Sequence, residues 1–394
     1  MNDRDSEALL GLFLRAGYKQ AESEEDADVI LVNTCSVRDH AENRALSLLG
    51  TYKKLKQSKV QSPKSKVNNY NNENSMDDGL STMDYPQRRK PIVGLIGCMA
   101  KNKGDEVFSK MPHIDLICGP AAFFKIPEYI ERIKDKGSRI KDLEDKVRDE
   151  SFYGAAFRQE IDHAQVVIST GCSNFCSYCI VPYTRGKLRP RSFDKIISEI
   201  KNNIKQGRRK ITLLGQNVND YNFEPQVTSH KSQVINFVEL LRKIYKIEGL
   251  EELDFVTSHP KNTSKELFEL MAESDKIKKH LHLPFQSGSN RILKLMGRGY
   301  TREKYAELIN QYKQITAGTL GTDIIIGFPS ESEEDFKQTK SLVKEVGFKY
   351  AFIFKYSPRL KTKAAEMADD VPEKVKSRRH KELLDLQKNI SRTL

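Results

Sequence analysis

The chain has 394 residues, of which 38% are hydrophobic and 30% are charged, and its basic residues outnumber its acidic ones to give a net charge of +12. These proportions are typical of a globular protein that is long enough for two domains. No apolar run approaches the roughly 20 residues of a membrane helix, and the first residues lack the apolar core of a secretory signal. We therefore expect a cytoplasmic protein without a membrane partner, or an organellar one if the source is a eukaryote.

The positive charge and the six cysteines reduce the range of functions to be considered. In a reducing compartment, cysteines serve as metal ligands more often than as disulfides. A surplus of basic residues favours a polyanionic partner such as a nucleic acid. The Lys- and Asn-rich composition that AT-rich genomes produce would explain the same surplus, so charge alone leaves both interpretations open.

Residues 1–135 alternate between helical and apolar segments, which predicts a small parallel α/β domain. Helices are expected at 6–16, 37–54 and from 123, and apolar strands at 28–33, 91–97 and 114–118. The segment 57–90 is rich in Ser, Asn, Lys and Asp, and it has too few apolar residues to offset its ordering entropy. We interpret it as a disordered insertion, and residues 136–160 as a charged linker.

A second domain is expected over residues 161–394, where short apolar strands alternate with helices as in a partial (β/α)6 barrel. The expected strands are 166–170, 210–214, 253–257, 280–284, 322–327 and 351–356, and a last helix is expected over 373–390. Ligands of such barrels bind at the carboxyl ends of the strands. The residues that follow each strand are therefore the candidates for a site.

Three cysteines with the spacing C-x3-C-x2-C follow the first of these strands: Cys172, Cys176 and Cys179. Three thiolates on one loop can bind three irons of a [4Fe–4S] cluster and leave the fourth iron open, whereas such clusters usually have four cysteine ligands. An open iron is a place for chemistry. The alternative is a structural zinc site with His163 or another cysteine as the fourth ligand. Zinc ribbons pair two C-x2-C knuckles, however, and the sequence has no second one.

Polar residues follow four further strands of the expected barrel. The segments are Gly215-Gln216-Asn217, Ser258-His259-Pro260, Gln286-Ser287-Gly288 and Gly327-Phe328-Pro329. Each of them alone is typical of an ordinary turn. Because all four lie on the side where barrels bind ligands, their succession favours a cofactor pocket. No side chain stands out as an acid–base catalyst, so the catalytic residues stay unknown.

A basic stretch follows the cysteine loop and contains Arg185, Lys187, Arg189 and Arg191 beside Tyr183. Arginine and lysine suit phosphate contacts, and an aromatic ring suits stacking with a base. The alternative is a solvated basic loop. The position of this basic stretch beside the expected site favours RNA binding over that alternative.

Two more cysteines, Cys35 and Cys98, end neighbouring strands of the first domain. A single cysteine at such a place is most often a small buried hydrophobe, and we expect this of Cys118, which completes an apolar run. Two cysteines at adjacent strand ends could instead converge on one metal site.

These motifs resemble those of the radical-SAM methylthiotransferases, and within them the MiaB type, which acts on an isopentenylated adenosine in tRNA. The resemblance covers nearly the whole chain apart from 57–90. Matching segments include Asn33-Thr34-Cys35-Ser36-Val37-Arg38, Gly97-Cys98-Met99-Ala100, Gly171 to Arg185, Thr257-Ser258-His259-Pro260 and Gln286-Ser287-Gly288-Ser289. The assignment to the MiaB type depends on two stretches, Ile180 to Gly186 and Gly215 to Asn219.

By this resemblance, Cys172, Cys176 and Cys179 bind a [4Fe–4S] cluster whose open iron binds S-adenosylmethionine (SAM), and its reduction yields a 5′-deoxyadenosyl radical. Cys35 and Cys98 are then two of three ligands of an auxiliary [4Fe–4S] cluster that supplies sulfur. The reaction converts N6-isopentenyladenosine in tRNA to its 2-methylthio derivative. The first domain is accordingly expected to be flavodoxin-like.

The resemblance also suggests ligands and partners for the site. The candidate SAM-binding residues are Tyr178, Gln216, Ser258 and Gln286. The expected partners are tRNA and a low-potential reductant of the flavodoxin or ferredoxin type, with the chain acting as a monomer.

Two departures from the family bear on these expectations. The family's third N-terminal cysteine and the first strand of that domain would precede Met1, and its C-terminal RNA-binding β-barrel would follow Leu394. A chain truncated at both ends is therefore expected, with incomplete ligands for the auxiliary cluster and weaker RNA affinity. The alternatives are a methylthiotransferase for threonylcarbamoyl-adenosine or a ribosomal protein, and a catalytically impaired iron–sulfur or RNA-binding fragment.

Overall fold

The structure is a computed structural model that describes the following parts of the chain: 1–36, 39–58, 90–145, 151–154, 157–225 and 234–393. These residues form two compact units, one of Phe13–Glu144 and the other of Met1–Leu12 with Asp145–Leu394. The units therefore meet in the sequence at 144, within the expected linker, and the first twelve residues belong to the second unit. The expected insertion 57–90 lies almost wholly outside the described residues.

The unit of Phe13–Glu144 is built on a parallel four-stranded sheet with the order β1-β2-β3-β4. Its strands are β1 (Val29–Thr34), β2 (Ile92–Gly97), β3 (Leu116–Cys118) and β4 (Ile140–Asp142). The first three lie where the sequence predicts them. Strand β4 lies in the segment expected to be a linker, because an edge strand with the sequence Ile-Lys-Asp has no apolar run to reveal it.

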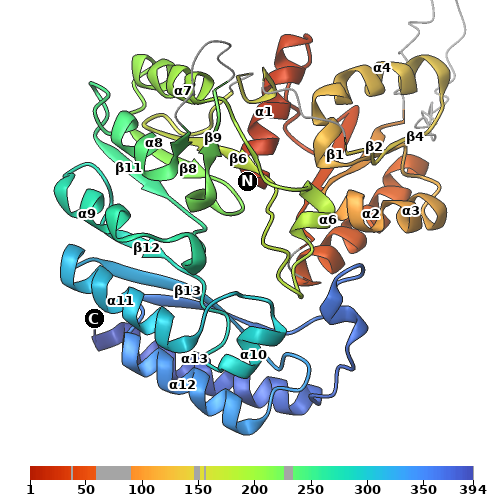
Figure 1. Cartoon of the computed structure of the whole chain (residues 1–394). Coiled ribbons are helices and arrows are strands. Elements are labelled where there is room, and N and C mark those ends of the chain that lie inside the picture. Colours follow the sequence, from red (N-terminus) through yellow and green to blue (C-terminus); the bar gives the residue numbers. More distant parts are fainter. Residues whose placement is uncertain (37–38, 59–89, 146–150, 155–156, 226–233, 394) are drawn as a thin grey trace, which may run out of the picture. The chain divides into compact units, whose positions relative to one another are not determined.

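Helices cover both faces of this sheet, with α4 on one side and α2 and α3 on the other (Figure 1). The described helices are α2 (Asp39–Ser58), α3 (Cys98–Lys110), η1 (Pro120–Lys125) and α4 (Ile126–Lys136). Helix α4 has a proline in its first turn and ends at Gly137, whose φ of 64° is the left-handed conformation that favours glycine. Leu49, Val93 and Ile117 are buried in the core between α2, α3 and the sheet.

The second unit contains two parallel three-stranded sheets with the orders β11-β8-β5 and β12-β13-β14. The strands are β5 (His163–Val167), β8 (Lys210–Leu214), β11 (Glu252–Phe255), β12 (His280–His282), β13 (Thr319–Ile326) and β14 (Tyr350–Lys355). A parallel bridge between Leu253 and Ile277 continues the series from one sheet toward the other. This order confirms the expected partial (β/α)6 barrel.

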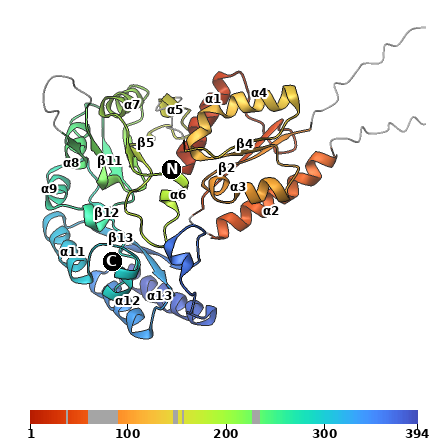
Figure 2. The same cartoon turned by 45° about the vertical axis from the view of Figure 1, so that its right-hand side comes forward.

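The main helices of this unit follow one another around the outside of the strands (Figure 2). They are α7 (Phe193–Lys205), α8 (Phe237–Ile244), α9 (Lys265–Glu273), α11 (Arg302–Thr316), α12 (Glu333–Val346) and α13 (Glu373–Thr393). Helices α8 and α12 begin with capping boxes at Asn236 and Ser332, which satisfy the first backbone N–H groups. No helix in the described part of the chain is long and apolar enough to span a membrane.

The remaining helices and strands of the unit are mostly short. They are α1 (Asn2–Arg15), whose residues up to Leu12 belong here, α5 (Ser151–Gly154), β6 (Ser169–Thr170), α6 (Val181–Arg185), β7 (Arg189–Pro190), η2 (Val218–Asp220), β9 (Asn222–Phe223), β10 (Ile235–Asn236), η3 (Pro260–Asn262), α10 (Asn290–Leu295) and η4 (Lys363–Glu366). Strand β6 pairs with β7, so the segment between them is a closed loop of the chain.

Candidate active site

The three cysteines of the C-x3-C-x2-C motif lie on this closed loop, after β6 and before α6. The Cys172 N–H donates to the Gly186 carbonyl at 3.1 Å, and the Cys179 N–H donates to the Cys176 carbonyl at 2.9 Å. These two bonds fold the loop back on itself. All three sulfur-bearing residues are thus presented from one short segment beyond the strands, as the sequence predicts.

The beginning of the loop requires a glycine. Gly171 has a φ of 76°, and a Cβ atom there would lie only 2.1 Å from the Lys187 carbonyl oxygen. The Gly171 N–H donates to Oε1 of Gln216 at 2.6 Å. Gln216, which we predict to bind SAM, therefore uses its side-chain oxygen to hold the cysteine loop.

Several residues other than glycine that follow strands of the barrel have left-handed backbone conformations. Phe175 lies within the loop with a φ of 47°, and Thr257 and Gln286 follow β11 and β12 with φ values of 72° and 67°. Such conformations cost free energy and tend to occur at functional sites. Their positions agree with a site at the carboxyl ends of the strands.

Several buried polar atoms around the loop have no hydrogen-bond partner among the described residues. They include Oγ of Ser169, Oγ of Ser177, Oδ1 of Asn217, Oγ of Ser258 and Oε1 of Gln286. An unpaired buried polar group costs about 1–3 kcal/mol, and folded proteins contain few of them. A ligand with several polar groups would satisfy these atoms, and SAM is such a ligand. Ser258 and Gln286 are among the predicted SAM-binding residues, whereas Ser169 and Ser177 are new.

Arg298, which sequence reasoning missed, lies next to the cysteine loop. Its Nη1 is 3.5 Å from Sγ of Cys176 and 3.4 Å from Oη of Tyr178. Its Nη2 donates to the Pro284 carbonyl at 2.7 Å, and its Nε donates to Oη of Tyr300 at 3.0 Å. The signal in the sequence that could have found it is the segment Met296 to Arg302, which also resembles the family.

Burial raises the pKa of the Cys179 thiol to about 12, and the neighbouring Cys176 adds to this effect. Burial likewise raises the pKa of Cys172. Thiols in such surroundings lose their protons only when a cation compensates the charge, which is what metal ligation does. The loop is therefore suited to thiolates that bind iron.

No group of three Cys, His, Asp or Glu side chains among the described residues is already gathered around a single metal ion. A cubane makes a different demand, because each thiolate binds its own iron and the sulfurs do not meet at one point. His163 does not complete a zinc site, since its Nδ1 is 2.8 Å from Glu160 and its Nε2 is 2.9 Å from Thr212. The donor set thus fits a [4Fe–4S] cluster better than zinc.

His259, which follows β11, is a neutral histidine inside the site. Burial lowers its pKa to about 2, and the positive charges of Arg298 and Lys261 add to this shift. Its Nδ1 accepts from the Lys261 N–H at 3.1 Å, so the proton of the neutral ring is on Nε2. This Nε2 has no partner among the described residues and is a donor for a ligand.

The four basic residues predicted to bind RNA lie in two different environments. Arg185 donates to Oδ2 of Asp5 at 2.8 Å, and Arg191 is buried and donates to Oε2 of Glu199 at 2.8 Å. Lys187 and Arg189 are exposed. Carboxylates of this chain therefore engage Arg185 and Arg191, whereas Lys187 and Arg189 are the two exposed members of the set.

In the other unit, Cys35 and Cys98 follow directly on Thr34 and Gly97, which are paired partners on adjacent strands. Cys98 is buried and is the first residue of α3. Cys118 is paired with Ile96 on the neighbouring strand β2 and is completely buried, which confirms the prediction that it is a core residue.

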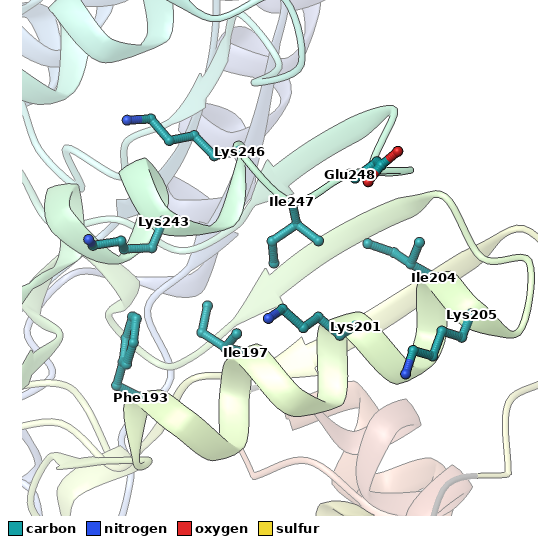
Figure 3. A pocket seen from close by; sticks show the side chains of 9 residues that line it. All are labelled: Phe193, Ile197, Lys201, Ile204, Lys205, Lys243, Lys246, Ile247 and Glu248. Carbon is teal, nitrogen blue, oxygen red and sulfur yellow. The ribbon is translucent and has the colours of Figure 1, made fainter.

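A separate hollow of about 590 Å³ lies between α7 and the residues at the end of α8 (Figure 3). Ile197, Ile204 and Ile247 form its apolar wall, and Lys201, Lys205, Lys243 and Lys246 stand around it. It contains no cysteine or histidine and lies on the outer helix layer. The candidate site is therefore the cysteine loop and not this hollow.

Residues 166–343 match the Radical SAM superfamily, and residues 1–119 match the Uncharacterized protein family UPF0004. Together with the barrel and the three-cysteine loop, these matches define a radical-SAM enzyme, with a [4Fe–4S] cluster and SAM as its cofactors. A protein of Natranaerobius thermophilus named tRNA-2-methylthio-N(6)-dimethylallyladenosine synthase is 40% identical over 397 residues, which cover 99% of this chain and 80% of the relative. The chain belongs to this family of methylthiotransferases.

Further relatives carry the same name. The protein of Clostridium novyi is 42% identical, with 98% of this chain and 78% of the relative covered. The protein of Clostridium tetani is also 42% identical, with the same coverage. The resemblance inferred from the sequence motifs is thus confirmed.

Solved structures with a similar fold are also radical-SAM enzymes. The methyltransferase TsrM from Kitasatospora setae, with tryptophan and a SAM analogue bound, has a TM-score of 0.57 at 12% identity, covering 90% of this chain and 70% of that one. The cobalamin-dependent enzyme OxsB has a TM-score of 0.51 at 12% identity, and this chain covers 48% of its length. At such identities the likeness confirms the fold alone.

Proposed function

We propose that this chain is a radical-SAM tRNA methylthiotransferase that converts N6-isopentenyladenosine beside the anticodon to its 2-methylthio derivative. The observation that carries this proposal is the three-cysteine loop at the carboxyl end of the barrel, surrounded by unsatisfied polar atoms, in a member of this family. The C–H bond that must be replaced has no useful acidity. The cofactors therefore supply the difficult step, and the protein supplies binding and orientation.

Cys172, Cys176 and Cys179 would hold the radical-SAM cluster. When bound, the cluster and SAM would supply the radical chemistry that opens the adenine C–H bond. The unpaired oxygens of Ser258 and Gln286 are placed to hydrogen-bond the polar groups of SAM.

Other residues of the site hold it in shape or add a contact. Gln216 fixes the start of the cysteine loop through Gly171. The neutral ring of His259 offers Nε2–H to a ligand acceptor and does not change its charge near neutral pH. Tyr178, a predicted SAM contact, lies with its hydroxyl against Arg298.

Cys35 and Cys98 would contribute to the auxiliary cluster that supplies sulfur. Their support is their position directly after Thr34 and Gly97, which are paired residues at the carboxyl ends of neighbouring strands. Lys187 and Arg189 would contact the phosphates of tRNA. The reductant would be a flavodoxin or ferredoxin, and the chain would act as a cytoplasmic monomer.

The proposal is tested by expressing the chain in cells that lack their own methylthiotransferase and analysing the nucleosides of bulk tRNA by mass spectrometry. We expect 2-methylthio-isopentenyladenosine to reappear, and a Cys172→Ala variant to leave only the isopentenyl form. If the intact chain accumulates in the cells and the isopentenyl form alone persists, the proposed substrate is wrong.

A further inference from the structure

Arg298 is a buried cation for which the described part of the chain provides no carboxylate. Its side chain is almost completely buried, with 5% of the residue exposed. Other buried arginines of the same unit are paired differently: Arg158 and Arg191 both contact Glu199, at 2.5 and 2.8 Å, and Arg379 contacts Glu331 at 2.7 Å. Burying an unpaired charge costs several kcal/mol, so the absence of a carboxylate beside Arg298 calls for another anion.

The guanidinium of Arg298 is held in one orientation. The Pro284 carbonyl accepts from Nη2 and Oη of Tyr300 accepts from Nε, while the Tyr300 hydroxyl itself donates to the Phe285 carbonyl at 2.9 Å. A planar guanidinium fixed at two nitrogens has its third nitrogen fixed as well. That nitrogen, Nη1, is the one that lies 3.5 Å from Sγ of Cys176.

The anion that suits this position is the thiolate-bound cluster itself. Three thiolates and the sulfides of a cubane outweigh the charge of its irons, and reduction adds a further negative charge. Hydrogen bonds to the sulfurs and nearby charge set the reduction potential of such clusters. A fixed cation stabilises the more negative, reduced form more than the oxidised one.

We propose that Arg298 is a positioning residue that donates to the cluster-bound sulfur of Cys176 and raises the reduction potential of the radical-SAM cluster. This proposal rests on the proposed cluster ligands. It assigns to the barrel a built-in counter-charge that makes the cluster easier to reduce by its electron donor.

The test is a redox titration, followed by electron paramagnetic resonance, of the anaerobically reconstituted chain. The background carries Cys35→Ala and Cys98→Ala, so that only the radical-SAM cluster is titrated. In this background we expect Arg298→Met to weaken the one-electron reduction equilibrium at least tenfold, which corresponds to about 59 mV. Arg298→Lys keeps the charge but loses the planar donor. Its reduction potential should therefore lie between those of Arg298→Met and the background chain.

The matched control is Arg242→Met, which removes the same charge from an exposed arginine in the last turn of α8 and should leave the potential unchanged. Tyr300→Phe keeps the guanidinium but removes the acceptor of its Nε, and it should lower the potential by less than Arg298→Met. If Arg298→Met does not fold, as judged by circular dichroism, the potentials of Arg298→Lys and Tyr300→Phe test the proposal. Both should be lower than that of the background chain, and unchanged potentials would overturn the proposal.

The outcomes separate this proposal from the proposed function. A background chain that fails to bind about four irons contradicts the ligand assignment itself. A fully loaded Arg298→Met chain with the potential of the background chain overturns the role of Arg298 alone. A folded Arg298→Met chain that loses iron, while Arg298→Lys and Arg242→Met retain it, supports the counter-charge.

Discussion

His259 illustrates how burial at a single residue fixes a protonation state. Its pKa is lowered to about 2 in the folded chain, whereas an ordinary histidine titrates near 6.5. Below that pH the unfolded chain takes up a proton that the folded chain does not. Stability therefore falls as the pH is lowered from 7 to 5, by about 2 kcal/mol from this residue.

We expect His259→Asn to remove this part of the pH dependence. Asparagine can still accept the Lys261 N–H, as residues at the start of a helix commonly do, but it does not titrate. Urea unfolding at pH 5 and 7 would measure the difference in both chains, so that other titrating groups cancel. An identical pH dependence in the two chains would show that His259 is not kept neutral by burial.

Gly171 is a second residue whose role can be isolated. Alanine at this position would place Cβ 2.1 Å from the Lys187 carbonyl oxygen, at a φ that also disfavours any side chain. Gly207→Ala is the matched control, because its φ is 89° but nothing lies within 4 Å of the added atom. After reconstitution, Gly171→Ala should bind much less iron than Gly207→Ala. Equal iron contents would mean that the loop tolerates displacement.

The sequence could predict those site residues that lie close together along the chain, but not those that meet only in the fold. The spacing of Cys172, Cys176 and Cys179 lies within one loop and can be recognised from the sequence. Arg298 comes to Cys176 from 122 residues along the chain, and no local pattern reports such a contact. The sequence likewise does not show that Arg191, a predicted RNA contact, is buried against Glu199, because this pairing is visible only in the fold.

At the scale of elements, the first turn of α1 is joined to the barrel by a buried ionic network. Glu199 of α7 receives Arg158 and Arg191, and it also lies 3.5 Å from Arg4 of α1. Burial lowers the pKa of Arg4 to about 10, and the nearby Arg158 contributes to this shift. Glu199 thus lies among three buried guanidinium groups, and Glu7 is a second carboxylate beside Arg4 and Arg158.

Glu199→Gln should therefore destabilise the chain by about 3–5 kcal/mol, because it removes the carboxylate of the buried Arg191 and one of the two carboxylates beside Arg158. Chemical denaturation would measure the loss. Glu251→Gln is the control, since Glu251 pairs with Arg209 on an exposed surface and such pairs contribute little. Similar effects of both substitutions would show that the network is not a buried one in solution.

The element-level prediction from sequence succeeded where apolar runs are long. Strands such as β8 and β13 are largely buried and contain β-branched residues, so their apolar runs can be recognised in the sequence. Strand β4 has only Ile140 as an apolar residue and depends on β3 for its backbone partners. Tertiary pairing decides such an element, and periodicity does not reveal it.

At the scale of the whole molecule, the net charge of +12 leaves open which basic residues meet RNA. Lys187 and Arg189 lie beside the cysteine loop, and both are exposed. If they contact phosphates, replacing both by glutamine should weaken tRNA binding and reduce the slope of log K against log salt by about two, or one for each contact. Filter binding of tRNA at a series of salt concentrations would measure both quantities.

A control with the same change in net charge separates contact from general attraction. Lys381 and Lys388 are exposed on α13, in the outer helix layer, and replacing both by glutamine removes the same two charges. Because a distant charge is screened within about 10 Å at ordinary salt, this control should leave the slope nearly unchanged. If the two double variants lower affinity and slope equally, tRNA is attracted by the overall charge of the molecule, and the basic stretch after the cysteine loop makes no specific contact.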